Sequence, residues 1–196
     1  MEKEEKSIAH SVNKEEHVPF LRKPFIRQMC LTALFLALMC VLSPLSIPVG
    51  PIPITLATLI LYITGSLLDW KYTPLVIVLY LLLGVIGLPV FSSFQGGPQI
   101  LLGPTGGYLV GYLPCIIIES LLISFFKDKK WLYPIAMVLG TVILYLLGSI
   151  WFMFYKEMDF GKTLLICVVP FLGGDAFKIG IASFCAFKLR PLIDRR

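Results

Sequence analysis

Three ionisable residues interrupt the long apolar stretches of this sequence, namely Glu119, Asp175 and Lys178. A charge inside a lipid bilayer costs about 3 kcal/mol, so residues of this kind usually face a cavity or pair with one another. Asp175 and Lys178 are three positions apart and therefore share one face of a helix. One interpretation is a salt bridge that neutralises both side chains. We favour a second, in which they face a polar solute, with Asp175 accepting N–H bonds and Lys178 meeting an anionic group.

Glu119 lies in the segment CIIIESLLISFF, close to Ser120 and Ser124. We expect it to form an interhelical hydrogen bond or to snorkel toward the inner membrane surface, rather than to contact a ligand. A different interpretation makes Glu119 and Asp175 the acid and base of a membrane enzyme. The two acids fall on separate predicted helices at different depths, which weakens that interpretation.

Glycine and proline are concentrated in the stretch GGPQILLGPTGGYLVGY, residues 96–112, which holds no charged residue. The segment SPLSIPVGPIP, residues 43–53, is also free of charge and rich in proline. Irregular backbone at membrane depth must be buried in protein or line a cavity. Both segments are therefore expected to fold over a binding site.

A few side chains beside these segments could meet a ligand. Gln95 and Gln99 can both donate and accept hydrogen bonds. Phe91 and Tyr108 could form apolar or amphipathic walls of a pocket. The alternative for the aromatic residues is a belt at the membrane interface.

The composition is that of a membrane protein. Of 196 residues, 57% are hydrophobic and 15% are charged, and the mean hydropathy is +0.86. A soluble domain of this size cannot bury so much apolar surface. We predict an all-α membrane protein whose six transmembrane helices and Gly/Pro-rich outer loops cap a ligand cavity. The predicted spans are Phe25–Leu42, Ile54–Leu68, Thr73–Leu88, Thr105–Phe126, Leu132–Phe154 and a sixth that ends near Leu189.

Two prolines are expected to disturb these helices. Pro114 should kink the fourth span. Pro170, followed by Gly173 and Gly174, should end one helical segment and start another. We therefore expect a short outer helix or re-entrant piece over residues 162–170 and a last span that begins near Gly173.

Lysine and arginine are distributed unevenly between the two sides of the predicted bundle. Fourteen of the seventeen fall on one side, which the positive-inside rule places in the cytoplasm together with both termini. Residues 1–20 mix both signs of charge and are predicted to be a disordered tail, ahead of one domain over residues 21–196. Because the net charge of +5 reflects membrane orientation, nucleic acid is not an expected partner.

No catalytic or metal-binding motif stands out in the chain. The five cysteines form no CxxC pair, and the two histidines lie in the charged N-terminal segment. The HExxH, GxSxG and Walker lysine motifs are absent. We therefore expect no metal, no cofactor and no nucleotide site.

Several motifs resemble those of the BioY family, the biotin-specific substrate-binding (S) components of energy-coupling-factor (ECF) vitamin transporters. The motifs are VGPIPITLATL at 49–59, LYLLLGVIGLPVF at 79–91, GG at 96–97, LLGPTGGYLVGY at 101–112 and VPFLGGDAFKI at 169–179. The resemblance covers nearly all of the chain after residue 25. It implies six membrane helices in the cytoplasmic membrane and a biotin site near the outer surface. It also implies a transport subunit, with ATP hydrolysis in separate partners.

The resemblance also implies roles for individual residues. Asp175 and Lys178 match the family's Asp and Lys, and Gln95 falls where relatives carry a polar residue. Asp175 and Gln95 could then satisfy the urea of biotin, and Lys178 could attract its carboxylate. The residues implied to cover the fused rings are Tyr108, Phe91 and the loop glycine Gly97.

Ala33 and Ala37 are four positions apart on one face of the first predicted helix. Small residues at this spacing let helices pack closely in lipid. They match the motif by which such S components meet a membrane coupling protein, the T component, which acts with two cytoplasmic ATPases. Two alternatives remain beside biotin uptake: transport of another vitamin or of a precursor such as dethiobiotin, and a scaffold without a ligand.

Overall fold

The computed structural model describes residues 23–48, 51–126 and 131–194, and these residues are mostly helical. The tail predicted over residues 1–20 lies outside the described part of the chain. The elements are α2 (Lys23–Leu42), β1 (Ser46–Ile47), β2 (Ile54–Thr55), α3 (Ala57–Leu67), α4 (Thr73–Ile86), η1 (Ser92–Phe94), α5 (Pro98–Leu101), α6 (Gly106–Phe125), α7 (Leu132–Lys156), α8 (Phe160–Cys167) and α9 (Val169–Asp194).

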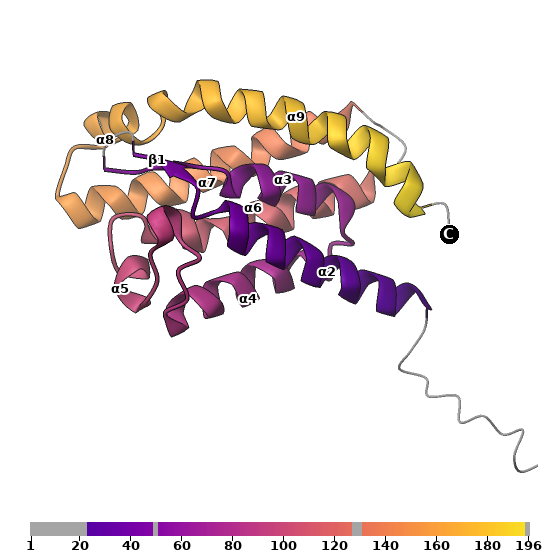
Figure 1. Ribbon diagram of the computed structural model, residues 1–196. Coiled ribbons are helices and arrows are strands. Elements are labelled where there is room, and N and C mark those ends of the chain that lie inside the picture. The colour runs from indigo at the N-terminus through magenta and orange to yellow at the C-terminus, as the bar shows by residue number, and fades with distance from the viewer. Residues whose placement is uncertain (1–22, 49–50, 127–130, 195–196) are drawn as a thin grey trace, which may run out of the picture.

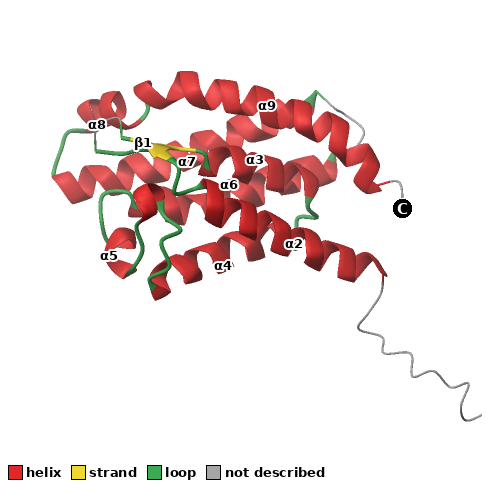
Figure 2. Ribbon diagram, viewed as in Figure 1, coloured by secondary structure: helices red, strands yellow, loops and turns green. Residues whose placement is uncertain are grey.

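The long helices run side by side as one bundle (Figure 1). Most of the irregular segments gather with β1, α5 and α8 at one end, at the left of Figures 1 and 2. We call this end of the bundle the loop end. The first residues of α2 and the last residues of α9 both lie at the end of the bundle opposite the loop end.

Four helices are long and apolar enough to cross a membrane, judged by length and composition over the described ranges. The other two predicted spans are shorter apolar helices, 11 residues in α3 and 14 in α4. The four longer segments are Phe25–Leu42, Gly106–Phe125, Leu132–Lys156 and Val169–Ile193.

Helices α3 and α4 are both shorter than their predicted spans at the ends that face the loop end. Ile54 and Thr55 form the antiparallel ribbon β1–β2 with Ser46–Ile47, so α3 begins only at Ala57. Helix α4 ends before Gly87, whose φ of +109° is a left-handed conformation that glycine adopts easily at the end of a helix. The predicted spans are therefore too long at these two ends.

The predicted start of the last span near Gly173 is wrong. The expected short helix is present as α8, but the chain leaves helical geometry at Val168 (φ −121°, ψ −52°), and α9 then runs unbroken. Pro170 lies in the first turn of α9, where its missing N–H removes no intrahelical hydrogen bond. Gly173 sits in open space within the helix. As a result, Asp175 lies about two turns into α9 rather than at its start.

Helices α6 and α7 approach each other closely at glycine. A Cβ on Gly148 of α7 would lie 2.4 Å from the Tyr108 ring of α6, and one on Gly107 would lie 2.2 Å from Trp151 Cβ. Small residues allow such contacts between membrane helices. Helix α6 continues through Pro114 to Phe125. The close packing fixes Tyr108 against α7 at the loop end.

Candidate functional site

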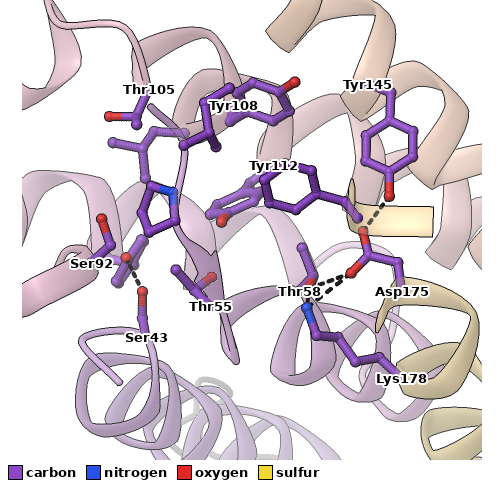
Figure 3. A pocket seen from close by; sticks show the side chains of 15 residues that line it. Ser43, Thr55, Thr58, Ser92, Thr105, Tyr108, Tyr112, Tyr145, Asp175 and Lys178 are labelled. Atoms are coloured by element: carbon purple, nitrogen blue, oxygen red, sulfur yellow. Dashed lines mark hydrogen bonds and ion pairs between the residues drawn. The ribbon is translucent and has the colours of Figure 1, made fainter. Parts of the chain in front are cut away.

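A cavity lies among the helices at the loop end (Figure 3). It contains about 590 Å³ of space between atoms, counting the part open to the outside. Small-molecule sites typically combine a few polar groups with a mainly apolar lining. The lining residues are Ser43, Ile52, Pro53, Thr55, Thr58, Tyr80, Ser92, Thr105, Tyr108, Leu109, Tyr112, Tyr145, Phe171, Asp175 and Lys178.

One end of the cavity holds a group of side chains centred on Asp175. Lys178 Nζ donates to Asp175 Oδ1 and to Thr58 Oγ1, both at 2.9 Å. Tyr145 Oη donates to Asp175 Oδ2 at 2.5 Å, and Thr58 Oγ1 donates to Asp175 Oδ1 at 3.3 Å. The four side chains converge in Figure 3, and we call them the polar cluster.

Three helices bring the polar cluster together. Asp175 and Lys178 come from one face of α9, as their spacing predicts. Thr58 lies in the first turn of α3, just after the β1–β2 ribbon, and Tyr145 lies midway along α7. The cluster therefore depends on how α3 and α7 pack against α9.

The polar cluster is almost closed to the outside, with Asp175 4% and Lys178 8% exposed. A buried ion pair is costly unless further hydrogen bonds satisfy both partners, and the hydroxyls of Thr58 and Tyr145 supply them here. The pair forms the salt bridge of the first interpretation, and both side chains also line the cavity, as the second interpretation requires. They present a carboxylate acceptor beside ammonium and hydroxyl donors, which suits a ligand group with adjacent N–H and C=O.

Tyrosines of α6 form the middle wall of the cavity. Tyr108 and Tyr112 lie one helical turn apart, and both line the cavity (Figure 3). Tyr108 Oη donates to the carbonyl oxygen of Cys167 at 3.0 Å, which ties α6 to the end of α8. The structure thus places Tyr108 between the polar cluster and the loops.

Phe91 and Gly97 do not line the cavity. Phe91 is fully buried and packs edge to face on Tyr80, a lining residue, with ring centroids 5.5 Å apart. Gly97 has a φ of +102°, and its N–H donates to the carbonyl oxygen of Gly84 at 2.7 Å. Both residues hold the loop before α5 against the end of α4, behind the cavity wall.

Gln95 is also separate from the polar cluster. A β-bridge between Phe91 and Gln95 folds this segment back on itself, and the Gln95 side chain is exposed. It borders a second hollow at the loop end together with Gln99. The structure therefore brings Asp175 and Lys178 together without Gln95, because a local turn that spacing does not reveal directs the glutamine elsewhere.

Glu119 lies away from the cavity, fully buried between α3 and α6. Ser66 Oγ of α3 donates to Glu119 Oε1 at 3.2 Å, which confirms the interhelical hydrogen bond. The snorkelling alternative is wrong, because the side chain has no exposed surface. Glu119 and Asp175 share no cavity, so the geometry gives no support to an acid–base pair.

Ala33 and Ala37 lie on the exposed side of α2. Phe35 and Met39, on the other side of the same helix, are buried in the bundle. The pair of alanines therefore stands on a surface of α2 that the rest of the described chain does not cover.

Sequence reasoning did not identify Thr58 or Tyr145. A hydroxyl in an apolar helix carries no charge, and its role depends on which helix packs beside it. The one signal was the occurrence of these hydroxyls within the apolar runs ITLATL and ILYLLGS. Within the described ranges, no group of three or more His, Cys, Asp or Glu residues could hold a metal ion.

Comparisons with known proteins show what this chain is similar to. Residues 9–195 match the model of the BioY family. The biotin transporter BioY of Thermotoga maritima is 38% identical over 167 residues, which are 85% of this chain and 98% of that protein. Biotin transporter BioY2 of Lactococcus lactis subsp. cremoris is 36% identical over 76% of this chain and 82% of its own. The crystal structure of an S-component for biotin from an ECF-type ABC transporter matches with a TM-score of 0.80 and 28% identity, over 85% of this chain and 92% of that one.

Proposed function

The chain belongs to the BioY family, and we propose that it binds biotin with high affinity and mediates biotin uptake as the S component of an ATP-driven ECF transporter. It is a membrane transport subunit and not an enzyme. The observation that carries the proposal is the polar cluster at one end of a largely apolar cavity. Relatives named as biotin transporters support the same ligand.

The chemistry of biotin suits the cavity. Its urea has two N–H donors and one carbonyl acceptor, and we place this group against the polar cluster. Asp175 would accept the N–H bonds, while Lys178 and Tyr145 would donate to the carbonyl oxygen. The sulfur-bearing ring would lie against Tyr108 and Phe171. Phe91, Gly97 and Gln95 would shape the loop behind and above the cavity without touching the urea.

The membrane arrangement in this proposal goes beyond the four long spans. We place α3 and α4 as two further, shorter crossings, which gives six helices and puts the Gly/Pro-rich segments on the outer side. Both termini then lie in the cytoplasm, as the distribution of lysine and arginine favours. Residues 1–20 would be a separate tail before the domain 21–196.

The partners are the remaining part of the proposal. The exposed face of α2 that carries Ala33 and Ala37 is the surface we assign to a membrane coupling protein. That protein would connect the chain to two cytoplasmic ATPases. No cofactor is needed for binding, and biotin is the transported ligand.

Titration of the purified chain with biotin tests the proposal. In detergent and without ATP, calorimetry should show saturable binding of biotin to a single site. Competition with dethiobiotin and with other vitamins then ranks the solutes. The absence of saturation at micromolar biotin, or tighter binding of a different vitamin, would contradict the proposed ligand.

A further inference from the structure

The end of the cavity opposite the polar cluster has a different chemistry. Four residues with hydroxyl side chains gather there (Figure 3): Ser43, Thr55, Ser92 and Thr105. We call them the hydroxyl end. A hydroxyl can both donate and accept a hydrogen bond, and none of these four side chains carries a charge.

Two hydroxyls of this group are available to a ligand. Ser43 Oγ is hydrogen-bonded to Tyr80 Oη at 2.6 Å, and Thr55 Oγ1 accepts from the Ala57 N–H at 3.3 Å. By contrast, Ser92 Oγ and Thr105 Oγ1 have no hydrogen-bond partner among the residues that the structure describes. Both belong to the lining, so they face a ligand with unused donors and acceptors.

The described lining of the cavity offers no free positive charge to an anionic ligand group. Asp175 and Lys178 are the charged residues of the described lining, and they neutralise each other at 2.9 Å. Lys178 is also held by Thr58, at the far end from Ser92 and Thr105. Thr105 does precede α6, whose N-terminal end carries a partial positive charge, but that attraction is modest.

The hydroxyl end leads into the second hollow at the loop end. Pro53, Ser92 and Thr105 line both spaces, so the two are adjacent. No charged residue is found in the described lining of the second hollow. Lys156 and Lys162, which lie near α8, are exposed and line neither space. A ligand tail that passes the hydroxyl end therefore meets room and uncharged groups.

We infer, resting on the proposed function, that uncharged hydroxyls recognise the carboxylate tail of biotin here, so that neutral biotin amides are also ligands of this chain. With the urea at the polar cluster, the tail points toward Ser92 and Thr105. A carboxylate that moves from water into a site without a counter-charge suffers a loss of solvation free energy. This loss offsets much of the free energy that its new hydrogen bonds contribute. An amide avoids that loss and can both donate to and accept from hydroxyls. Amides with a longer uncharged tail, such as N-butylbiotinamide, extend into the second hollow.

The test compares three ligands on the purified full chain in detergent: biotin, biotinamide and N-butylbiotinamide. We expect the Kd of each amide to lie within about tenfold of that of biotin, because a hydrogen bond to a neutral group differs from one to a charged group by about that factor. If biotin saturates the chain while biotinamide binds more than about a hundredfold more weakly, the inference is overturned and the proposed function stands. If biotin itself does not bind, the proposed function fails first.

Two variants locate the tail. The double variant Ser92→Ala with Thr105→Val should weaken biotin and biotinamide by about tenfold each, since both ligands lose hydroxyl contacts. Ser124→Ala, a hydroxyl deletion outside both linings, is the matched control and should leave both Kd values unchanged. Unchanged affinity in a folded double variant contradicts this position for the tail. If that variant does not fold, the comparison of ligands on the unaltered chain still decides.

Discussion

Two buried carboxylates, Asp175 in the cavity at the loop end and Glu119 between α3 and α6, have opposite surroundings. Asp175 receives hydrogen bonds from Lys178, Tyr145 and Thr58 and borders a cavity. Glu119 accepts a hydrogen bond from Ser66 at Oε1, and its Oε2 has no partner within the described chain. Asp175 is equipped to hold a charge and to meet a ligand, whereas Glu119 is enclosed by packing.

The packing around Glu119 is tight on the α3 side. A Cβ on Gly65 would lie 2.7 Å from Glu119 Cδ, so the glycine leaves just enough room for the carboxyl group. Burial alone therefore does not mark a functional acid in this bundle. A functional acid is distinguished by a neighbouring cavity together with a full set of hydrogen-bond donors. Substitutions at Asp175 and Glu119 can test this distinction.

The largest effect is expected for Asp175→Asn. The amide replaces one acceptor oxygen by a donor and leaves Lys178 without its counter-charge, and breaking a buried pair in this way costs about 3–5 kcal/mol. We expect biotin affinity to fall by at least about a hundredfold. Calorimetry measures the affinity, and thermal unfolding shows whether the variant is folded. Biotin binding at nearly unaltered affinity would remove Asp175 from the site.

A smaller effect is expected for Tyr145→Phe. The substitution removes the hydroxyl that donates to Asp175 Oδ2 and keeps the ring and its packing. A hydrogen bond to a charged group contributes about 1.5–3 kcal/mol, so we expect roughly a tenfold or greater loss of affinity. Tyr72→Phe, a tyrosine that lines neither the cavity nor the second hollow, is the matched control and should bind biotin normally. Equal affinities for the two variants would argue against a role for the Tyr145 hydroxyl.

Gly148→Ala tests the cavity wall rather than the polar cluster. The new Cβ would lie 2.4 Å from the Tyr108 ring, which must then shift. Overpacking of this kind costs about 1–3 kcal/mol in stability, and we expect roughly a fivefold loss of biotin affinity as Tyr108 moves. Gly180→Ala, where no atom lies within 4 Å of the new Cβ, is the control. If both alanine variants bind equally well, Tyr108 does not form part of the site.

The smallest effect is expected for Glu119→Gln. The side chain keeps its shape and its contact with Ser66, and it lies outside the cavity lining. Biotin affinity should change by less than about threefold, since isosteric changes away from a site are nearly neutral. A large loss of binding in a folded Glu119→Gln variant would show that the two buried acids act together. It would contradict the contrast between Asp175 and Glu119.

Most of the helices could be predicted from the apolar runs, because membrane spans are long and uniform. The fourth span, expected at Thr105–Phe126, is observed as Gly106–Phe125. The start of α3 could not be predicted, since Ile54 and Thr55 continue its apolar run but pair with Ser46 and Ile47 in a ribbon. The break expected near Gly173 was wrong because proline is compatible with the first turn of a helix.

The site could be predicted in part, because some of its contacts join residues that are far apart in the sequence. Asp175 and Lys178 are visible in the sequence because charges are rare in apolar helices. Thr58 and Tyr145 reach the same cluster only through the packing of α3 and α7 against α9. Gln95 was assigned to the urea from its position in a motif, while the turn at Phe91–Gln95 exposes it.

A crystal structure of this chain with biotin bound would show whether the urea binds at the polar cluster. We expect both urea nitrogens on the Asp175 side of the cavity, with at least one within hydrogen-bond distance of a carboxylate oxygen, and the tail directed toward Ser92 and Thr105. Biotin bound in the reverse direction, with its carboxylate on Lys178, or bound outside this cavity, would contradict the account.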